Sequence, residues 1–178
     1  MYIDILKQIV NNYERYKKIA VNLEWVEFNS KFYNWYEYPH GMIVTVCDFP
    51  KNYVKENSEQ AYVQAVLCNM AYQEEWEQDF WKITSSERLE YMTQANSLYS
   101  DYMTYKEYHM KPVTEDYLIN EIKLHADKYS IPENEVNSVI PYLTGTENIE
   151  IGGFYGCDST FISIKDNSIM LLECGIWY

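Results

Sequence analysis

The sequence lacks the features that mark exported and membrane proteins. Its first residues, Met1 to Leu6, contain no basic region of the kind that opens a signal peptide. Its longest apolar runs, such as Met42 to Val46 and Ile169 to Leu172, are far too short to cross a bilayer. These absences predict a protein in the cytoplasm of the cell that makes or hosts it.

Motifs for nucleotide binding, hydrolysis and metal binding are also missing. The chain has no Gly-x-x-x-x-Gly-Lys-Ser/Thr loop, no Gly-x-Ser-x-Gly turn and no His-Glu-x-x-His helix. The glycine-rich stretch 152–156 is not followed by a helical pattern, so we expect a bulge or tight turn between strands there rather than a phosphate loop. The sequence therefore predicts no cofactor and no metal site, and gives no positive reason to assign an enzyme.

The cysteines do not form a recognisable framework. Cys47, Cys68, Cys157 and Cys174 include no Cys-x-x-Cys pair and no zinc-site spacing, which predicts free and mostly buried thiols. Cys47 stands near His40 and Asp48 in the sequence, so a cysteine-dependent enzyme using Cys47 or Cys157 remains an alternative. His125 falls on the apolar face of its predicted helix, where a core imidazole is expected.

Basic residues are scarce. Asp and Glu number 27 against 14 Lys and Arg, which gives a formal net charge of −13. Such a chain repels phosphate backbones and anionic lipid, so direct binding to nucleic acid or a membrane surface is disfavoured. The electric field of the chain attracts basic protein surfaces instead. An excess of acidic residues also supports solubility by itself, which is the alternative reading.

Aromatic residues, by contrast, are abundant. The chain has 19 Tyr and 5 Trp. Tyr tolerates half-exposed positions because it joins an apolar ring to a hydroxyl, so these residues suit a protein-binding face. An AT-rich genome would also favour tyrosine codons.

Acidic and aromatic residues come together most densely after residue 73. The predicted partner-binding residues are Glu74, Glu75, Trp76, Glu77, Asp79 and Trp81. On a helix, Glu75 and Asp79 form a like-charged pair four residues apart, which a cation would relieve. We therefore predict a docking patch for Lys or Arg of a partner with an aromatic anchor. The alternative is a solvated helix face.

Hydrophobic spacing and capping residues predict an α+β fold. We expect a single domain over 1–178, with central helices, N-terminal strands and a C-terminal antiparallel β-meander. Helices are predicted over 2–20 and 58–82, from the capping box at 84–87, after the cap Thr114, and from Pro132 to about Pro141. Two or three strands are predicted within 23–46, and a hairpin turn at 165–168.

Two families resemble this chain. Its acidic composition and the strand-rich ending 161–169 resemble the bacterial immunity proteins that neutralise polymorphic toxins. The stretch 159–163, together with 41–44 followed by Pro50, resembles segments of the ArdA-type antirestriction proteins, which are acidic phosphate mimics. Both resemblances imply a small inhibitor that acts by binding another protein in the cytoplasm of a bacterial cell. They leave open whether a bacterium, a phage or a mobile element encodes it.

The leading hypothesis is therefore an acidic inhibitor that blocks the basic nucleic-acid-binding surface of a partner. That partner would be a nuclease, a restriction or CRISPR effector, or a toxin. An immunity protein that binds its toxin through an aromatic interface is the first alternative, and a cysteine-dependent enzyme is the second. A regulatory or scaffolding homo-oligomer is a further one.

Overall fold

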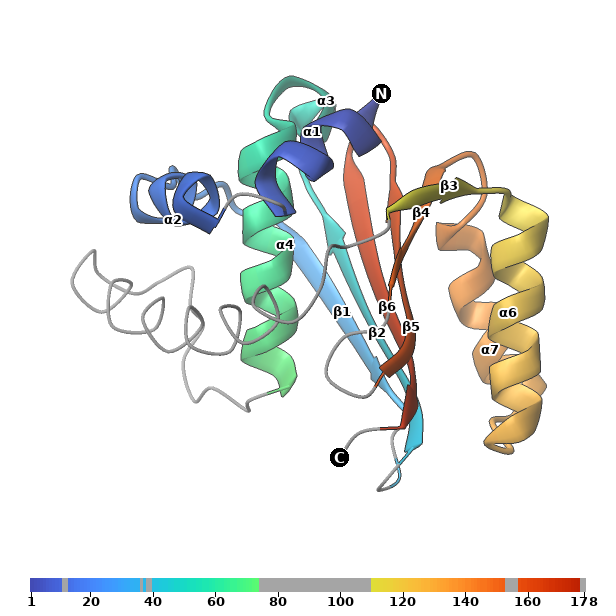
Figure 1. Cartoon of the computed structure of the whole chain (residues 1–178). Coiled ribbons are helices and arrows are strands. Elements are labelled where there is room, and N and C mark those ends of the chain that lie inside the picture. The colour runs from blue at the N-terminus through green and yellow to red at the C-terminus, as the bar shows by residue number, and fades with distance from the viewer. Residues whose placement is uncertain (11–12, 36, 38–39, 74–109, 153–156, 177–178) are drawn as a thin grey trace.

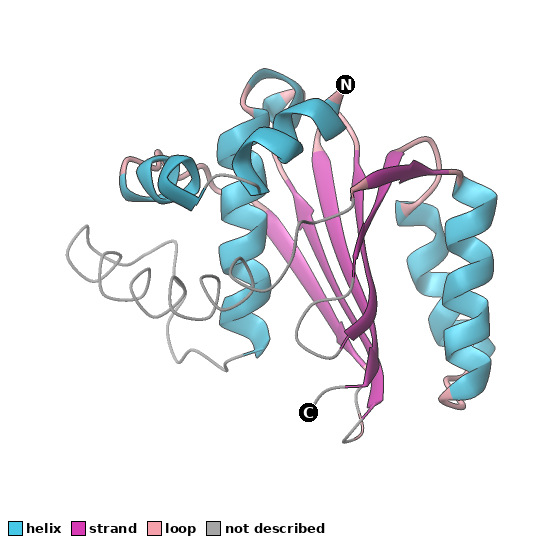
Figure 2. Cartoon of the chain, in the orientation of Figure 1, coloured by secondary structure: helices cyan, strands magenta, loops and turns pink. Residues whose placement is uncertain are grey.

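A six-stranded sheet stands between two layers of helices (Figure 1, Figure 2). The structure, a computed structural model, describes residues 1–10, 13–35, 37, 40–73, 110–152 and 157–176. The strands are β1 (Asn29–Asn34), β2 (His40–Asp48), β3 (Lys111–Val113), β4 (Glu147–Gly152), β5 (Cys157–Ile164) and β6 (Ser168–Ile176). Their order across the sheet is β1-β2-β6-β5-β4-β3, and every neighbouring pair is antiparallel. The predicted α+β fold class is confirmed.

The helices divide between the two faces of the sheet (Figure 1). One face carries α1 (Tyr2–Val10), α2 (Tyr13–Val21), α3 (Tyr53–Glu56) and α4 (Ser58–Gln73). The other carries α6 (Glu115–Lys128), α7 (Glu133–Val139) and the short 3-10 turn Ile140–Tyr142. Within the described ranges, no helix combines the length and apolar character needed to cross a membrane.

The central strands are buried on both faces, which explains why their sequences are apolar without alternation. Along β2, Val44 and Val46 pack toward α6 and α7, while Cys47 packs toward α4. Along β6, Leu172 and Leu171 divide between the same two cores. Because β6 pairs with both β2 and β5, it joins strands from the two ends of the chain into one sheet.

Helix α4 is held on the sheet by buried polar groups as well as by apolar packing. The Thr45 hydroxyl donates to the Asn69 side-chain oxygen at 2.7 Å, and both residues are buried. Gln64, fully buried, accepts a hydrogen bond from the backbone N–H of Val26 and donates one to the Tyr53 hydroxyl. Since a buried polar group without a partner is costly, these bonds specify how α4 sits against its neighbours.

Several sequence predictions are confirmed in detail. Thr114 caps α6, its side-chain oxygen accepting from the backbone N–H of Tyr117. The predicted turn after β5 joins two paired strands, with Ile164 opposite Ile169. Two strands, β1 and β2, form within the N-terminal region as expected.

Other predictions are wrong or untested. The single helix predicted over 2–20 is two helices, α1 and α2. The predicted helix 58–82 is observed as α4 as far as Gln73; its remainder, and the helix predicted from Thr84, lie outside the described residues. The sequence pattern missed β3, because three residues around Pro112 give no periodic signal.

Candidate functional site

The predicted docking patch at 74–81 lies outside the described residues. Glu74, Glu75, Trp76, Glu77, Asp79 and Trp81 therefore stay a prediction from sequence alone. The described part of the chain places α4, which ends at Gln73, directly before this patch.

The cysteines in the described core are buried and unoxidised. Cys47, Cys68 and Cys174 form no disulfide among the described residues, and none has exposed surface. Burial, followed by the hydrogen bond and charge of Cys68, raises the pKa of the Cys47 thiol well above its ordinary value. A nucleophilic cysteine needs the opposite shift, so this environment argues against Cys47 as a catalytic thiol. Cys157 begins β5, and its side chain is not described.

His125 is a core histidine, as its position on the helix predicts. It is buried on the inner face of α6, and its Nδ1 lies 2.9 Å from the backbone oxygen of Glu121. His40 is exposed at the start of β2 and stacks on Tyr129, with ring centroids 5.0 Å apart. In the described part of the chain, no three His, Cys, Asp or Glu side chains are placed to hold a metal ion.

A pocket open to solvent, of about 370 Å³, lies beside the N-terminus of α1. It is lined by Tyr2, Gly145, Glu147, Ile164, Lys165, Asp166 and Asn167. The Glu147 carboxylate accepts hydrogen bonds from the backbone N–H groups of Tyr2 and Ile3, both at 3.0 Å. Asp166 accepts a hydrogen bond from the Tyr2 hydroxyl. Burial first, and then this hydrogen bond, raises the pKa of Tyr2 to about 12. The carboxylates of this pocket thus cap and anchor α1, which is a structural role.

One buried carboxylate escaped the sequence reasoning. Glu173 lies in the middle of β6 with only 8% of its surface exposed. Its neighbours across the sheet are Ile43 and Thr160, and the Thr160 hydroxyl has no hydrogen-bond partner within the described residues. Glu173 itself has a partner, so its burial does not by itself indicate a reactive group. The signal available in the sequence was a charged residue that continues the alternation of Ile169 and Leu171, two positions beyond Leu171 and so on the same face of the strand.

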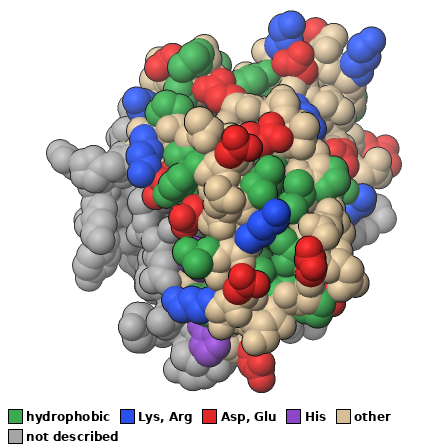
Figure 3. Space-filling model, turned by 90° about the vertical axis from the view of Figure 1, so that its right-hand side faces the viewer, with side chains coloured by type: hydrophobic (Ala, Val, Ile, Leu, Met, Phe, Trp, Pro, Cys, Tyr) green, Lys and Arg blue, Asp and Glu red, His purple; other side chains and the backbone are tan. Residues whose placement is uncertain are grey.

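The outer face of α6 combines carboxylates with exposed apolar side chains. Tyr117 is 38% exposed and Leu124 is 62% exposed, although both are large and apolar. Asp116 and Asp127 are exposed on the same helix, and Glu121 is half-buried between the two apolar residues. Figure 3 shows this side of the molecule, where hydrophobic side chains lie among both acidic and basic side chains. The sequence reasoning considered only the buried face of this helix.

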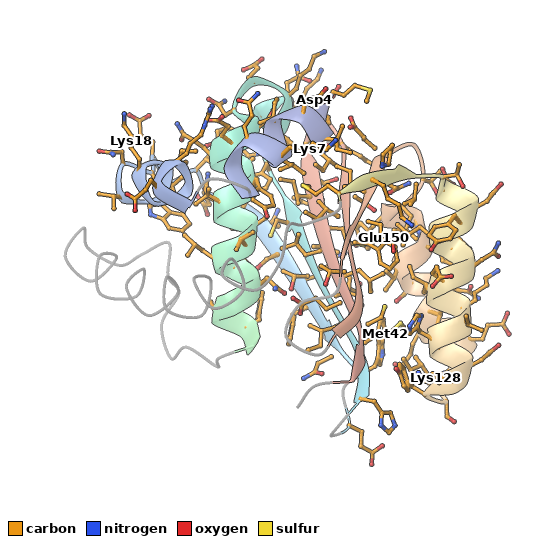
Figure 4. All side chains as sticks on the ribbon, in the orientation of Figure 1. Asp4, Lys7, Lys18, Met42, Lys128 and Glu150 are labelled. Atoms are coloured by element: carbon orange, nitrogen blue, oxygen red, sulfur yellow. The ribbon has the colours of Figure 1, made fainter. Side chains whose placement is uncertain are left out.

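Two lysines at this side of the molecule contact other groups of the chain. The Lys111 ammonium lies 2.8 Å from a Glu150 carboxylate oxygen and 5.9 Å from the centre of the Tyr117 ring. Figure 4 labels Glu150 between the sheet edge and α6, and Lys128 at the far end of that helix. The Lys128 ammonium lies over the ring of Tyr129, at 5.2 Å. The charge of Glu121 also acts on Lys111.

Burial and the neighbouring carboxylates act on the Tyr117 hydroxyl in the same direction. Partial burial, and then the negative charges of Glu150 and Glu121, raise the pKa of Tyr117 above its ordinary value. The bond to Glu150 likewise raises the pKa of Lys111, which stays protonated. The local arrangement is a cation held between a carboxylate and an aromatic ring.

No family model, no curated protein and no solved structure matches this chain.

Proposed function

We propose that the chain is an acidic inhibitor that binds and blocks the basic nucleic-acid-binding surface of a partner protein. The partner would be a nuclease, a restriction or CRISPR effector, or a toxin. The proposal predicts an interaction driven by charge, with apolar contacts at its centre.

One observation carries this proposal: carboxylates are exposed while several of the chain's own cations are engaged. Asp116, Asp127, Glu133 and other carboxylates stand exposed across the described surface. The basic side chains of Arg15, Lys31, Lys111 and Lys128 contact carboxylates or tyrosines of the same chain. These exposed carboxylates present part of the chain's negative charge to solvent.

Exposed carboxylates can occupy the sites that a basic protein uses for phosphates. Arg and Lys pair with both groups through charge-assisted hydrogen bonds, so a carboxylate surface competes with a nucleic-acid backbone. Binding of this kind weakens as salt screens the charges, because the Debye length falls from about 10 Å at 0.1 M to about 3 Å at 1 M salt.

The proposal is tested by capturing partners from a candidate host lysate at roughly 50 mM and 500 mM salt, two conditions of very different screening. We expect a basic nucleic-acid-handling protein at the lower salt and a strong loss at the higher. A variant with Glu74, Glu75 and Glu77 changed to Gln and Asp79 to Asn tests the predicted patch. Its matched control changes four exposed carboxylates elsewhere to Gln, at Glu14, Glu27, Glu37 and Glu56.

Each outcome has a defined meaning. If the patch variant and its control retain the same binding, the assignment of the patch is wrong. If no basic protein is captured at either salt, the inhibitor function itself is wrong.

An immunity protein with an aromatic interface is the second candidate, favoured by the exposed Tyr117 on α6. Its complex would survive the higher salt, because apolar contacts do not depend on screening. Aromatic-to-Ala changes would then weaken binding more than removal of charge does.

A further inference from the structure

The outer edge of β1 carries backbone groups that the sheet does not use. β1 is the last strand at one side of the sheet, so only its other side pairs, with β2 (Figure 1). The Trp35 N–H donates to the backbone oxygen of Met42 on β2 at 2.9 Å. Because the hydrogen bonds of an antiparallel strand alternate, every second residue before Trp35 also faces β2. The N–H and C=O groups of Ser30 and Phe32 therefore point away from the sheet.

The two edges of the sheet differ in how they are protected against pairing with another strand. At the far edge, β3 has only three residues and Pro112 in its middle, and both features block strand addition. β1 has six residues and no Pro, and its register with β2 is regular throughout. Its one charged side chain, Lys31, donates to the Tyr142 hydroxyl on the α7 side of the sheet. Of the two edges, β1 is therefore the one suited to pairing with another strand.

The side chains along β1 are held in place by the layers on both faces of the sheet. On the α4 face, the Phe32 ring stacks on the Tyr72 ring, with centroids 4.8 Å apart and nearly parallel planes. The Ser30 hydroxyl lies 2.7 Å from the Tyr72 hydroxyl. On the opposite face, Tyr33 stacks on Trp35, with centroids 5.5 Å apart. These contacts fix side-chain rotamers in advance, which lowers the entropy cost of forming an interface.

Charge and register favour a second copy of the chain as the occupant of this edge. Although the net charge of the chain is −13, β1 contains one Lys and no acidic residue, so the strand itself neither attracts a basic segment nor repels its own copy. A two-fold axis at Phe32 uses the whole strand and places Lys31 of each copy opposite Tyr33 of the other. Lys31 already makes such a cation–aromatic contact with Tyr142. An axis at Lys31 would instead oppose two ammonium groups, which is destabilising.

We propose that the chain forms a dimer through its β1 edges, in which the two β1 strands pair antiparallel and join both sheets into one. At the axis, the N–H of each Phe32 donates to the C=O of Phe32 in the other copy. The outward backbone groups of Ser30 then face Asn34 of the other copy. This pairing goes beyond the proposed inhibitor function and does not depend on it.

Exposed carboxylates beyond the two ends of β1 predict how the dimer responds to salt. Glu27 precedes the strand and Glu37 follows it, so Glu27 of one copy lies toward Glu37 of the other in this register. Salt screens this repulsion and the repulsion between two net charges of −13. The dimer should therefore tighten between about 50 mM and 500 mM salt, whereas binding of a basic partner should weaken over the same range.

Hydrogen exchange in the unmodified chain tests the pairing, at about 20 µM and about 1 mM protein in about 500 mM salt. The amides of Ser30 and Phe32 should exchange more slowly at the higher concentration, because the dimer buries them in new hydrogen bonds. The amides of Lys31 and Tyr33 face β2 and should change little. In a mixture of isotope-labelled and unlabelled chains, we expect an NOE between the Hα atoms of Lys31 in one copy and Tyr33 in the other, which form a closely spaced pair without mutual hydrogen bonds.

Two substitutions at Ser30 separate the backbone edge from the side chain. Ser30→Pro removes the outward N–H and places a ring at the edge, while the hydrogen bonds to β2 come from other residues. Ser30→Ala removes the same hydroxyl from Tyr72 but keeps the N–H, so it is the matched control. Analytical ultracentrifugation should show a dimer at least about tenfold weaker for Ser30→Pro than for Ser30→Ala, from a lost hydrogen bond and a steric block.

The results that contradict the dimer differ from those that contradict the inhibitor function. A chain that stays monomeric at about 1 mM protein and about 500 mM salt has no such dimer. A dimer in which the Ser30 and Phe32 amides gain no protection, or in which Ser30→Pro and Ser30→Ala associate equally, does not pair through β1. If Ser30→Pro fails to fold, exchange and the NOE in the unmodified chain decide. Capture of a basic partner at low salt is a separate measurement that none of these results affects.

Discussion

At the scale of single residues, the buried polar pair Thr45 and Asn69 is a sensitive point of the fold. Thr45→Val removes the donor to Asn69 and leaves a buried amide oxygen without its partner, which should lower the free energy of unfolding by about 1–3 kcal/mol. Urea denaturation measures the change. Thr144→Val, at an exposed position, is the control and should have little effect.

The companion double variant separates the hydrogen bond from general packing. Adding Asn69→Leu to Thr45→Val removes both polar partners, so the double variant should be more stable than the sum of the two single changes predicts. Strict additivity would show that the 2.7 Å hydrogen bond is not energetically important.

The buried thiol of Cys47 predicts how the free energy of unfolding depends on pH. Burial raises its pKa in the folded protein, so the unfolded chain loses this proton at lower pH, near the ordinary value of about 8.5. Below that pH the thiol is protonated in both states and its full contribution to the free energy of unfolding is present. As the pH rises above it, the unfolded chain loses the proton first, so this contribution is lost. Cys47→Ala should show a smaller fall in the free energy of unfolding between about pH 7 and 9.5 than the original chain does.

Thiol labelling provides an independent measurement on the same residue. In the native protein at neutral pH, Cys47 and Cys68 should resist iodoacetamide, and both should react once the chain is unfolded. Rapid labelling of Cys47 in the folded protein would contradict its burial and would support the hypothesis of a cysteine-dependent enzyme that uses this residue.

At the scale of elements, helix α1 is secured by a carboxylate from the far end of the chain. Glu147→Gln keeps the shape of the side chain but removes its charge. It also replaces one of the two oxygens that accept hydrogen bonds from the N–H groups at the start of α1. Loss of such a cap costs about 0.5–2 kcal/mol. Hydrogen exchange in residues 2–10 should therefore quicken, while exchange in α6 should not change.

The exposed Glu37 offers the control for that experiment, because Glu37→Gln removes the same charge away from any helix. Equal effects of the two variants on α1 would mean that net charge, rather than the cap, is responsible.

Local signals in the sequence predicted the elements that depend on local physics. The Thr114 cap and the turn at 165–168 were recognisable because their geometry is set by neighbouring residues. The break between α1 and α2 was missed because the apolar spacing continues through residues 9–16. The pairing of β2 with β6, more than a hundred residues apart, has no local signal, so the single shared sheet could not be predicted.

The candidate sites likewise divide into features that neighbouring residues determine and features that depend on the tertiary fold. The buried state of Cys47 and His125 followed from apolar surroundings in the sequence. The exposure of Leu124 did not, because only the packing of α6 decides which of its faces meets solvent. The contact of Lys111 with Glu150 depends on strand pairing between β3 and β4, and β3 itself was missed.

At the scale of the whole molecule, the excess of carboxylates is the reason that we propose basic proteins as partners. A net charge of −13 raises association rates with basic proteins and makes them sensitive to salt. Apolar contacts at the centre of the interface would add affinity that salt does not remove. The two contributions can thus be separated by measuring affinity at several salt concentrations.

The most direct measurement is a competition assay on the captured basic partner, using labelled nucleic acid already bound to it. The account predicts that the chain displaces the nucleic acid at roughly 50 mM salt and does so much less effectively at roughly 500 mM, when screening is strong. A complex that contains the partner, the nucleic acid and the chain together, without displacement at either salt, would contradict it.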